Sequence, residues 1–266
     1  MTAADTSSLL LEGAIEPLGR LSDASNDALL VRVGGEAAGA VAVYKPVAGE
    51  RPLWDFPDGT LAEREVAAYA ISQAGGWGAV PTTVLREGPL GVGSVQEWVG
   101  SLDEPPGRVV EVFPPNAVPA GWHRVLEGQG RRGEPLVVAH ADTPEMRAMA
   151  VFDVVLNNSD RKGSHLLVAE GRLFGIDHGV SLHTEPKLRT ILWGWAGEPI
   201  PPAEQERVAA VATALAEPDS PLRSQLERLL TPAEVAALKA RCHALLEHPA
   251  YPVPSGRWPA IPWPPL

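Results

Sequence analysis

The pattern of apolar and polar positions divides the chain into a strand-rich first part and a helix-rich second part. Residues 28–33 and 38–44 are apolar, β-branched runs joined by Gly34-Gly35-Glu36, which predicts a β-hairpin. Residues 82–85 and 92–99 repeat this pattern around a Gly-containing turn. The first part is therefore expected to form an antiparallel sheet.

Helical signals are also clear. Thr60 with Glu63 forms a capping-box pattern before residues 61–74, and Thr143 followed by a proline predicts the start of a helix over 144–156. Residues 109–138 are rich in Pro and Gly and allow no assignment. Three more helices are expected, at 203–216, 221–229 and 232–246.

This order of elements predicts an α+β protein with two lobes. The first lobe, an antiparallel sheet plus one helix, is expected over residues 11–100. The second, mostly helical lobe follows over 101–248, and a tail rich in Pro and Trp covers 249–266. A ligand site between two such lobes is a common arrangement.

Composition narrows the class of protein. The chain has 266 residues, of which 45% are hydrophobic and 21% charged, and its net charge is −11. Such a chain can bury a real core, and its acidity disfavours nucleic acid and anionic membranes as partners. The single Cys242 excludes an intramolecular disulfide. The N-terminus lacks a signal-peptide pattern, and no apolar run reaches the length of a transmembrane segment, so we expect a cytoplasmic protein.

Candidate chemistry concentrates between residues 157 and 179. A polar loop, Asn157-Asn158-Ser159-Asp160-Arg161-Lys162, precedes a short hairpin that returns to Ile176-Asp177-His178-Gly179. Phosphoryl transfer needs one carboxylate that orients the acceptor hydroxyl, a second that holds a metal, and a further metal ligand. Asp160, Asp177 and His165 fit these three roles in turn.

These residues resemble the catalytic and metal-binding loops of phosphatidylinositol 3- and 4-kinases, whose pattern is Asp-Arg-x-x-x-Asn, a hairpin, then hydrophobic-Asp-x-Gly. The loop that starts at Asn157 is most similar to the type II phosphatidylinositol 4-kinases, and actinobacterial kinase-like proteins resemble the chain from about Leu11 to Leu246. The resemblance implies a bilobal protein-kinase-like fold, ATP, and Mg²⁺ or Mn²⁺. It makes Asp160 and Arg161 catalytic and gives the metal to His165 and Asp177. Lys162, also a catalytic candidate, replaces a histidine common in part of the family, and it either steadies the transferring phosphate or is simply solvated.

The resemblance also implies a nucleotide site in the first lobe. Lys45, at the end of a strand, is expected to hold phosphates and to pair with Glu65 on the following helix. Gln96, Glu97, Trp98 and Val99 resemble the hinge that receives adenine, and Ser22, Ser25 and Asn26 stand where a phosphate-covering loop is expected.

His165 departs from the family pattern, which has asparagine at this position. Imidazole is a softer ligand than an amide oxygen and suits manganese or zinc better than magnesium. Other readings of His165 are a phosphate contact, or a residue that fills a gap in a degenerate site.

Three functions remain open. The first is an ATP-dependent phosphotransferase that acts on a hydroxyl of a small molecule, an inositol-type headgroup or a protein. The second is a nucleotide-binding pseudokinase with a regulatory role. The third is a nucleotidyl transferase that modifies protein.

Overall fold

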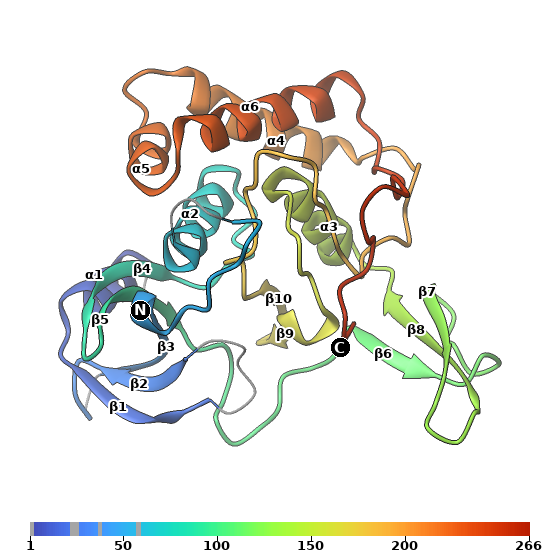
Figure 1. Cartoon of the computed structure of the whole chain (residues 1–266), viewed down its shortest axis with the longest axis horizontal. Helices are drawn as coiled ribbons and strands as arrows, with labels where there is room; N and C mark the ends of the chain where they lie inside the picture. The colour runs from blue at the N-terminus through green and yellow to red at the C-terminus, as the bar shows by residue number, and fades with distance from the viewer. Residues whose placement is uncertain (1–2, 22–26, 37–38, 57–59) are drawn as a thin grey trace.

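The computed structural model describes residues 3–21, 27–36, 39–56 and 60–266. Its first lobe is built on a five-stranded antiparallel sheet with the strand order β1-β2-β3-β5-β4 (Figure 1). The strands are β1 (Ile15–Arg20), β2 (Leu29–Val33), β3 (Ala40–Pro46), β4 (Thr83–Gly88) and β5 (Gly91–Glu97). Because β5 lies between β3 and β4, its backbone is hydrogen-bonded on both sides.

Helix α2 (Leu61–Ala74) lies between this sheet and the second lobe. It begins at Thr60, whose side chain accepts from the Glu63 N–H, while the Glu63 carboxylate accepts from the Thr60 N–H. A further carboxylate, Glu50, accepts from the next two free N–H groups, those of Leu61 and Ala62. These contacts satisfy the free donors at the helix N-terminus and fix its position.

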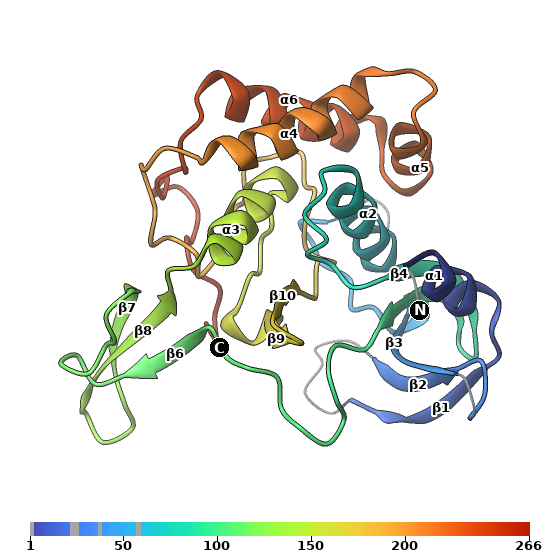
Figure 2. The same ribbon diagram turned by 180° about the vertical axis from the view of Figure 1, so that it is seen from behind.

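The second lobe contains most of the helices. Helix α3 (Pro144–Leu156) lies at its centre, with α4 (Pro202–Ala216) and α6 (Pro232–Glu247) packed over one side and α5 (Pro221–Leu229) against α2 (Figures 1 and 2). A hairpin of β9 (Leu166–Ala169) and β10 (Arg172–Gly175) leaves the loop after α3. The short 3-10 helices η1 (Val47–Gly49) and η2 (Gly163–His165) lie in the connections.

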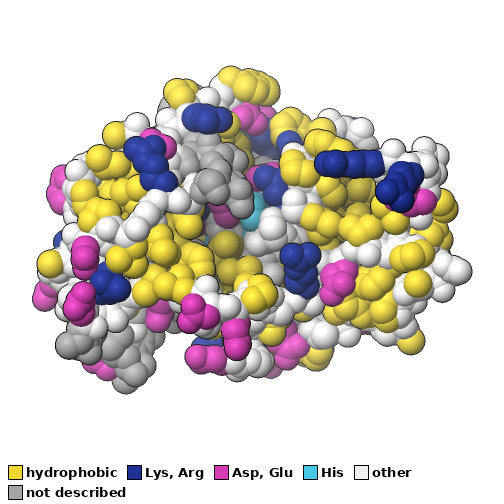
Figure 3. Space-filling view, turned by 90° about the horizontal axis from the view of Figure 1, so that it is seen from below, with side chains coloured by type: hydrophobic (Ala, Val, Ile, Leu, Met, Phe, Trp, Pro, Cys, Tyr) yellow, Lys and Arg dark blue, Asp and Glu magenta, His cyan; other side chains and the backbone are white. Residues whose placement is uncertain are grey.

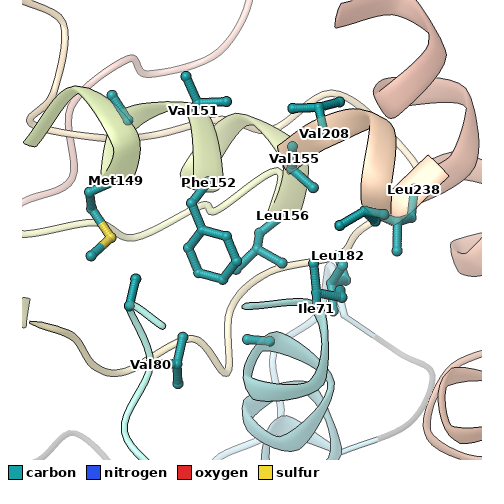
Figure 4. Packing of buried hydrophobic residues seen from close by; sticks show 14 of the residues in the cluster. Ile71, Val80, Met149, Val151, Phe152, Val155, Leu156, Leu182, Val208 and Leu238 are labelled. Carbon is teal, nitrogen blue, oxygen red and sulfur yellow. The ribbon is translucent and has the colours of Figure 1, made fainter. Parts of the chain in front are cut away.

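The main core forms around α3. Its apolar side chains, Phe152 and Leu156 among them, face Ile71 of α2, Val208 of α4 and Leu182 (Figure 4). Phe152, Leu156, Ile71 and Leu182 have no exposed surface, and burial of each such side chain contributes about 1.5–3 kcal/mol. The loops at either end of α3 and α2 are thereby held on a rigid support.

Two parts of the fold were not predicted from the sequence. Residues 109–138 lie within a three-stranded sheet of order β6-β8-β7, formed by β6 (Val110–Phe113), β7 (Trp122–Gln129) and β8 (Pro135–Ala141). The first lobe also begins with helix α1 (Ala3–Glu12) and strand β1.

The two-lobed α+β fold expected from the sequence is confirmed, with an antiparallel sheet and one large helix in the first lobe and most helices in the second (Figure 1). The connection after β5 runs as an extended segment to Gly107, which pairs with Val168 of β9. Among the described helices, none has both the length and the apolar character that crossing a membrane requires.

Candidate active site

The site is built around Lys45 on β3. Its Nζ lies 2.5 Å from Glu65 Oε1 and 2.9 Å from Asp177 Oδ1. Burial alone lowers the pKa of Lys45, but the charges of Asp177 and Glu65 outweigh it and raise the pKa above its usual value, so the ammonium stays charged. The structure therefore brings together the strand lysine and the helix glutamate that the sequence singled out, and adds Asp177 to them.

Glu65 connects two loops as well as the lysine. Its side chain is only 3% exposed, and its second oxygen, Oε2, accepts from the backbone N–H of His178 at 2.9 Å. Glu65 thus fixes the lysine of one lobe and the Asp177 loop of the other. Asp177 itself has a φ of 59°, a left-handed conformation that costs a non-glycine residue about 1–2 kcal/mol. Strain of this kind persists where the surrounding structure holds the residue for a purpose.

The charge of Asp177 is set by its neighbours. Lys45 lowers the pKa of Asp177 well below its usual value, with a further contribution from the approach of His165. His165 Nε2 lies 3.3 Å from Asp177 Oδ2, and burial lowers the pKa of His165 to about 4. At neutral pH the pair is therefore a carboxylate beside a neutral imidazole, which is the protonation state of a metal ligand.

Asp177 and His165 are spaced as two ligands of one divalent metal would be, but they supply only two ligands. Two ligands that bind one ion at about 2.1 Å with an angle near 100° lie roughly 3.2 Å apart, close to the observed separation of Asp177 Oδ2 and His165 Nε2. The described residues contain no group of three His, Cys, Asp or Glu side chains placed to hold a metal. A metal here would complete its coordination with phosphate oxygens and water, which is how Mg²⁺ usually binds beside a nucleotide.

Asp160 projects from the loop after α3 and has a different environment. Its carboxylate Oδ2 lies 2.9 Å from Lys162 Nζ, and Oδ1 lies 4.0 Å from Arg189 Nη2. Partial burial raises the pKa of Asp160 against the opposing effect of Lys162. A raised pKa makes this carboxylate a better proton acceptor than an ordinary aspartate.

The loop that carries Asp160 is held by a buried polar network. Asp153 on α3 has no exposed surface and accepts hydrogen bonds from Arg161 Nε and Nη2 at 3.0–3.1 Å and from Asn158 Nδ2 at 3.0 Å. Asn158 in turn accepts from the Asp160 N–H at 3.0 Å, and Thr190 donates to Asp153 at 3.3 Å. These contacts fix the backbone at Asp160.

Arg161 lies buried between the loop after α3 and the loop at Asp177. Its guanidinium is fully buried, donates to the Ile176 carbonyl at 2.9 Å, and contacts His178 Nε2 at 2.7 Å. With no exposed surface, this side chain links the loop at Asp160 to the loop at Asp177, and the catalytic role expected of Arg161 stays a prediction. Burial, with the nearby Arg161, holds the pKa of His178 well below its usual value. A neutral His178 can accept the arginine N–H.

The proposed hinge is only partly available to a ligand. The Gln96 side chain donates to Thr83 at 2.9 Å, and the backbone N–H groups of Glu97 and Trp98 donate to neighbouring strands at 2.8 and 2.9 Å. Gln96 and Glu97 therefore belong to the sheet, and the adenine contact expected at residues 96–99 stays a prediction. The expected phosphate-covering residues Ser22, Ser25 and Asn26 lie outside the described residues.

A cluster of aromatic rings joins the two lobes near this site. Lys187 Nζ lies 5.7, 5.6 and 5.2 Å from the ring centres of Trp54, Phe56 and Trp258, and 3.1 Å from Asp55 Oδ2. Cations are attracted to aromatic faces at such distances. We call these five residues the Lys187 cluster. It connects the segment before α2 to the second lobe and the tail.

The face that carries these groups is recessed. Viewed from below, a histidine with acidic and basic side chains beside it lies in a hollow between the five-stranded sheet and the β6–β8 part of the molecule (Figure 3). The fold and the paired lysine and carboxylates define the class of site that kinase-like proteins carry.

Solved structures agree on the fold. The structure of hydra Fam20 with sugar matches over 90% of this chain and 86% of that chain, with a TM-score of 0.55 and 11% identity. The Golgi casein kinase with Mn/ADP bound matches over 92% and 75%, with a TM-score of 0.59 and 11% identity. A further structure of the Golgi casein kinase matches over 92% of this chain and 74% of that chain, with a TM-score of 0.52 and 12% identity. At this identity the similarity shows a kinase-like fold.

At the level of sequence, the chain is 45% identical over 268 residues to Protein Rv2133c of Mycobacterium tuberculosis (strain ATCC 25618 / H37Rv), covering 98% of this chain and 95% of the relative. The chain belongs to the family of Protein Rv2133c. No known family profile matches it. The closer relation to phosphatidylinositol kinases stays a prediction.

Several residues of the site were not identified from the sequence. No role was predicted for Asp153, and its separation of eight residues from Arg161 gave no sign of their ion pair. Arg189 and Thr190 reach the loop through backbone pairing that only the folded chain creates, since Arg161 and Thr190 form an isolated parallel bridge.

Proposed function

We propose that this protein is an ATP-dependent phosphotransferase that transfers the γ-phosphoryl group to a hydroxyl. The observation that carries the proposal is the contact of Lys45 with both Glu65 and Asp177, which joins the sheet, helix α2 and the loop after β10 at one point. Kinases use such a lysine to hold nucleotide phosphates and such an aspartate to hold the metal. The bound Mn/ADP of one structural neighbour supports the same nucleotide and metal class here.

Each residue has a separate task in this proposal. Lys45 contacts the phosphates and is kept in place by Glu65. Asp160 orients the acceptor and takes the proton of its hydroxyl, as its raised pKa favours. The acceptor oxygen then forms a bond to the γ-phosphorus while the bond from that phosphorus to the β,γ-bridging oxygen breaks, and ADP leaves.

The residues around Asp177 prepare the phosphate end of the site. Asp177 and His165 would hold a divalent metal, which neutralises charge on the phosphates when bound. Lys162, 2.9 Å from Asp160, places a second positive charge beside the transferring group. The nucleotide would lie between the lobes formed by residues 11–100 and 101–248.

A second candidate function is a nucleotide-binding pseudokinase, which the imidazole at residue 165 favours because it replaces the hard oxygen ligand that suits magnesium. A third, nucleotidyl transfer, keeps the same site but cleaves at the α-phosphate. ATP labelled at the γ or at the α position separates transfer of phosphate from transfer of nucleotide. Failure to transfer either label while binding is retained supports the pseudokinase.

The decisive experiment compares two conservative variants. Asp177→Asn should weaken metal-dependent ATP binding, because the carboxylate holds the metal before any reaction. Asp160→Asn should leave ATP affinity nearly unchanged and abolish transfer, since it acts only in the chemical step. Asp219→Asn, which changes an exposed aspartate in the turn between α4 and α5, is the matched control and should change neither.

Calorimetry measures binding, and labelled phosphate measures transfer or slow hydrolysis. If Asp160→Asn abolishes nucleotide binding while Asp177→Asn leaves it intact, the two roles are reversed and the proposal is wrong. If the wild-type protein binds no nucleoside triphosphate at millimolar concentration, both the enzyme and the pseudokinase are excluded.

A further inference from the structure

Arg189 lies beside Asp160 because its backbone is tied to the same loop. The Arg189 N–H donates to the Asn158 carbonyl at 2.9 Å, and the Arg189 carbonyl accepts from the Arg161 N–H at 3.0 Å. The next hydrogen bond, from the Ile191 N–H to the Arg161 carbonyl, is 3.1 Å. Segment 189–191 therefore runs alongside the loop on both sides of Asp160, and the direction of the Arg189 side chain is set by a rigid backbone.

The guanidinium of Arg189 has an incomplete set of partners. Its Nε is buried and has no hydrogen-bond partner within the described part of the chain. The carboxylate with which it is paired, Asp160, lies 4.0 Å from Nη2, which is too far for a hydrogen bond. The side chain is 26% exposed, so it is open to a ligand from one side.

Two other cations near Arg189, Lys162 and Lys187, already have partners. Lys162 lies 2.9 Å from Asp160, and Lys187 lies 3.1 Å from Asp55 and within reach of three aromatic rings. Lys162 is nearer to Asp160 than Arg189 is, at 2.9 Å against 4.0 Å, so the Arg189 guanidinium keeps donors for another group. A planar guanidinium with free donors matches a carboxylate or phosphate.

Trp258 forms a wall next to this charge. The Arg189 guanidinium carbon lies 5.9 Å from the centre of the Trp258 ring, and the indole Nε1 is buried without a hydrogen-bond partner among the described residues. The tail that carries Trp258 is held to the same segment, because the Ala260 carbonyl accepts from the Thr190 N–H at 3.0 Å and from Trp193 Nε1 at 2.8 Å. An aromatic face beside a guanidinium can enclose a small polar molecule.

We infer that Arg189 and Trp258 form an acceptor subsite, which binds a phosphate or carboxylate group of a small hydroxylated molecule and so presents its hydroxyl to Asp160. The inference rests on the proposed phosphotransferase function, to which it adds the chemical class of the acceptor. An anionic acceptor places its charge on Arg189, away from the nucleotide phosphates at Lys45. A neutral polyol could accept hydrogen bonds from the guanidinium but would leave its positive charge without a counter-charge.

The test uses the full chain with inorganic phosphate and acetate as probes. Magnesium and a non-hydrolysable ATP analogue are added at saturation, so that the γ-phosphate position is filled. Binding of each anion is followed by calorimetry and by tryptophan fluorescence. We expect Arg189→Gln to weaken anion binding roughly tenfold to a hundredfold, the change that loss of a charge-assisted hydrogen bond produces. Trp258→Leu should weaken it less.

Two variants serve as controls. Arg223→Gln removes an exposed arginine on α5 that pairs with Glu227, and it should leave anion binding unchanged. Arg189→Lys keeps the charge without the planar fork and should bind the anions with intermediate affinity. Its thermal midpoint should match that of the wild type, which separates loss of the subsite from loss of the fold.

The outcomes distinguish this inference from the proposed function. If the analogue binds but neither anion binds more weakly to Arg189→Gln than to the wild type, the subsite is wrong and the phosphotransferase proposal stands. If the analogue does not bind but the anions bind in an Arg189-dependent way, the anion site stands and the phosphotransferase proposal fails. If neutral glycerol binds as well as the anions, the assigned acceptor class is wrong.

Discussion

The buried ion pair between Asp153 and Arg161 offers the sharpest test of how the site is supported. Both side chains are fully buried, and Asp153 takes hydrogen bonds from Arg161, Asn158 and Thr190. Asp153→Asn keeps the size of the side chain but leaves the guanidinium charge without a counter-charge. Breaking one partner of a buried pair costs about 3–5 kcal/mol, a large share of the roughly 5–15 kcal/mol that stabilises a typical protein.

Urea unfolding followed by tryptophan fluorescence measures this loss. The double variant Asp153→Leu with Arg161→Met removes both charges together and should recover part of the stability, because no unpaired buried charge remains. Phosphoryl transfer by the folded fraction should fall with Asp153→Asn, since the loop at Asp160 loosens. A loss below about 1 kcal/mol for Asp153→Asn, or a double variant less stable than the single one, would refute the reasoning.

Three further predictions follow from contacts described above. Lys45→Ala should weaken ATP binding more than Glu65→Ala does, because Glu65 acts through the lysine; equal effects in calorimetry would contradict that order. Burial lowers the pKa of His140 to about 4, so stability is fully present above pH 6.5 and is lost as the pH falls toward 4, by about 3 kcal/mol from this residue. His140→Gln should therefore reduce the difference in unfolding free energy between pH 7 and pH 4.5, and an unchanged difference would exclude His140 as the cause. Thr60→Ala removes one half of the capping box of α2 and should cost about 1 kcal/mol in urea unfolding, whereas Thr60→Ser should cost much less.

The sequence predicted best those elements whose boundaries are fixed by local chemistry. Helix α2 begins and ends where its capping residues and glycines indicated, and α5 agrees at both ends. The Lys45–Glu65 contact was also predicted, because the two residues resemble the lysine–glutamate pair of kinases. Local sequence patterns thus predicted helix α2 and the contact that holds Lys45 in place.

Features that depend on distant segments were harder to predict. Strands β6 to β8 gain their order from pairing across turns rich in Pro and Gly, where periodicity is short and interrupted. Arg161 was assigned to catalysis because its neighbours were, yet its burial follows from packing against α3 and cannot be read from the loop alone. Arg189 lies 29 residues from Asp160 in the numbering and reaches it only through the folded backbone.

The Lys187 cluster would make any separation of the two lobes detectable by chemical labelling. The chain has four lysines, at positions 45, 162, 187 and 239, and Lys239 is on an exposed face of α6. Lys187 is enclosed by Trp54, Phe56, Trp258 and Asp55, so amine-acylating reagents will modify it slowly while the lobes are together. Separation of the lobes would open this enclosure. The ratio of labelling at Lys187 to labelling at Lys239 therefore reports lobe opening within an untagged protein.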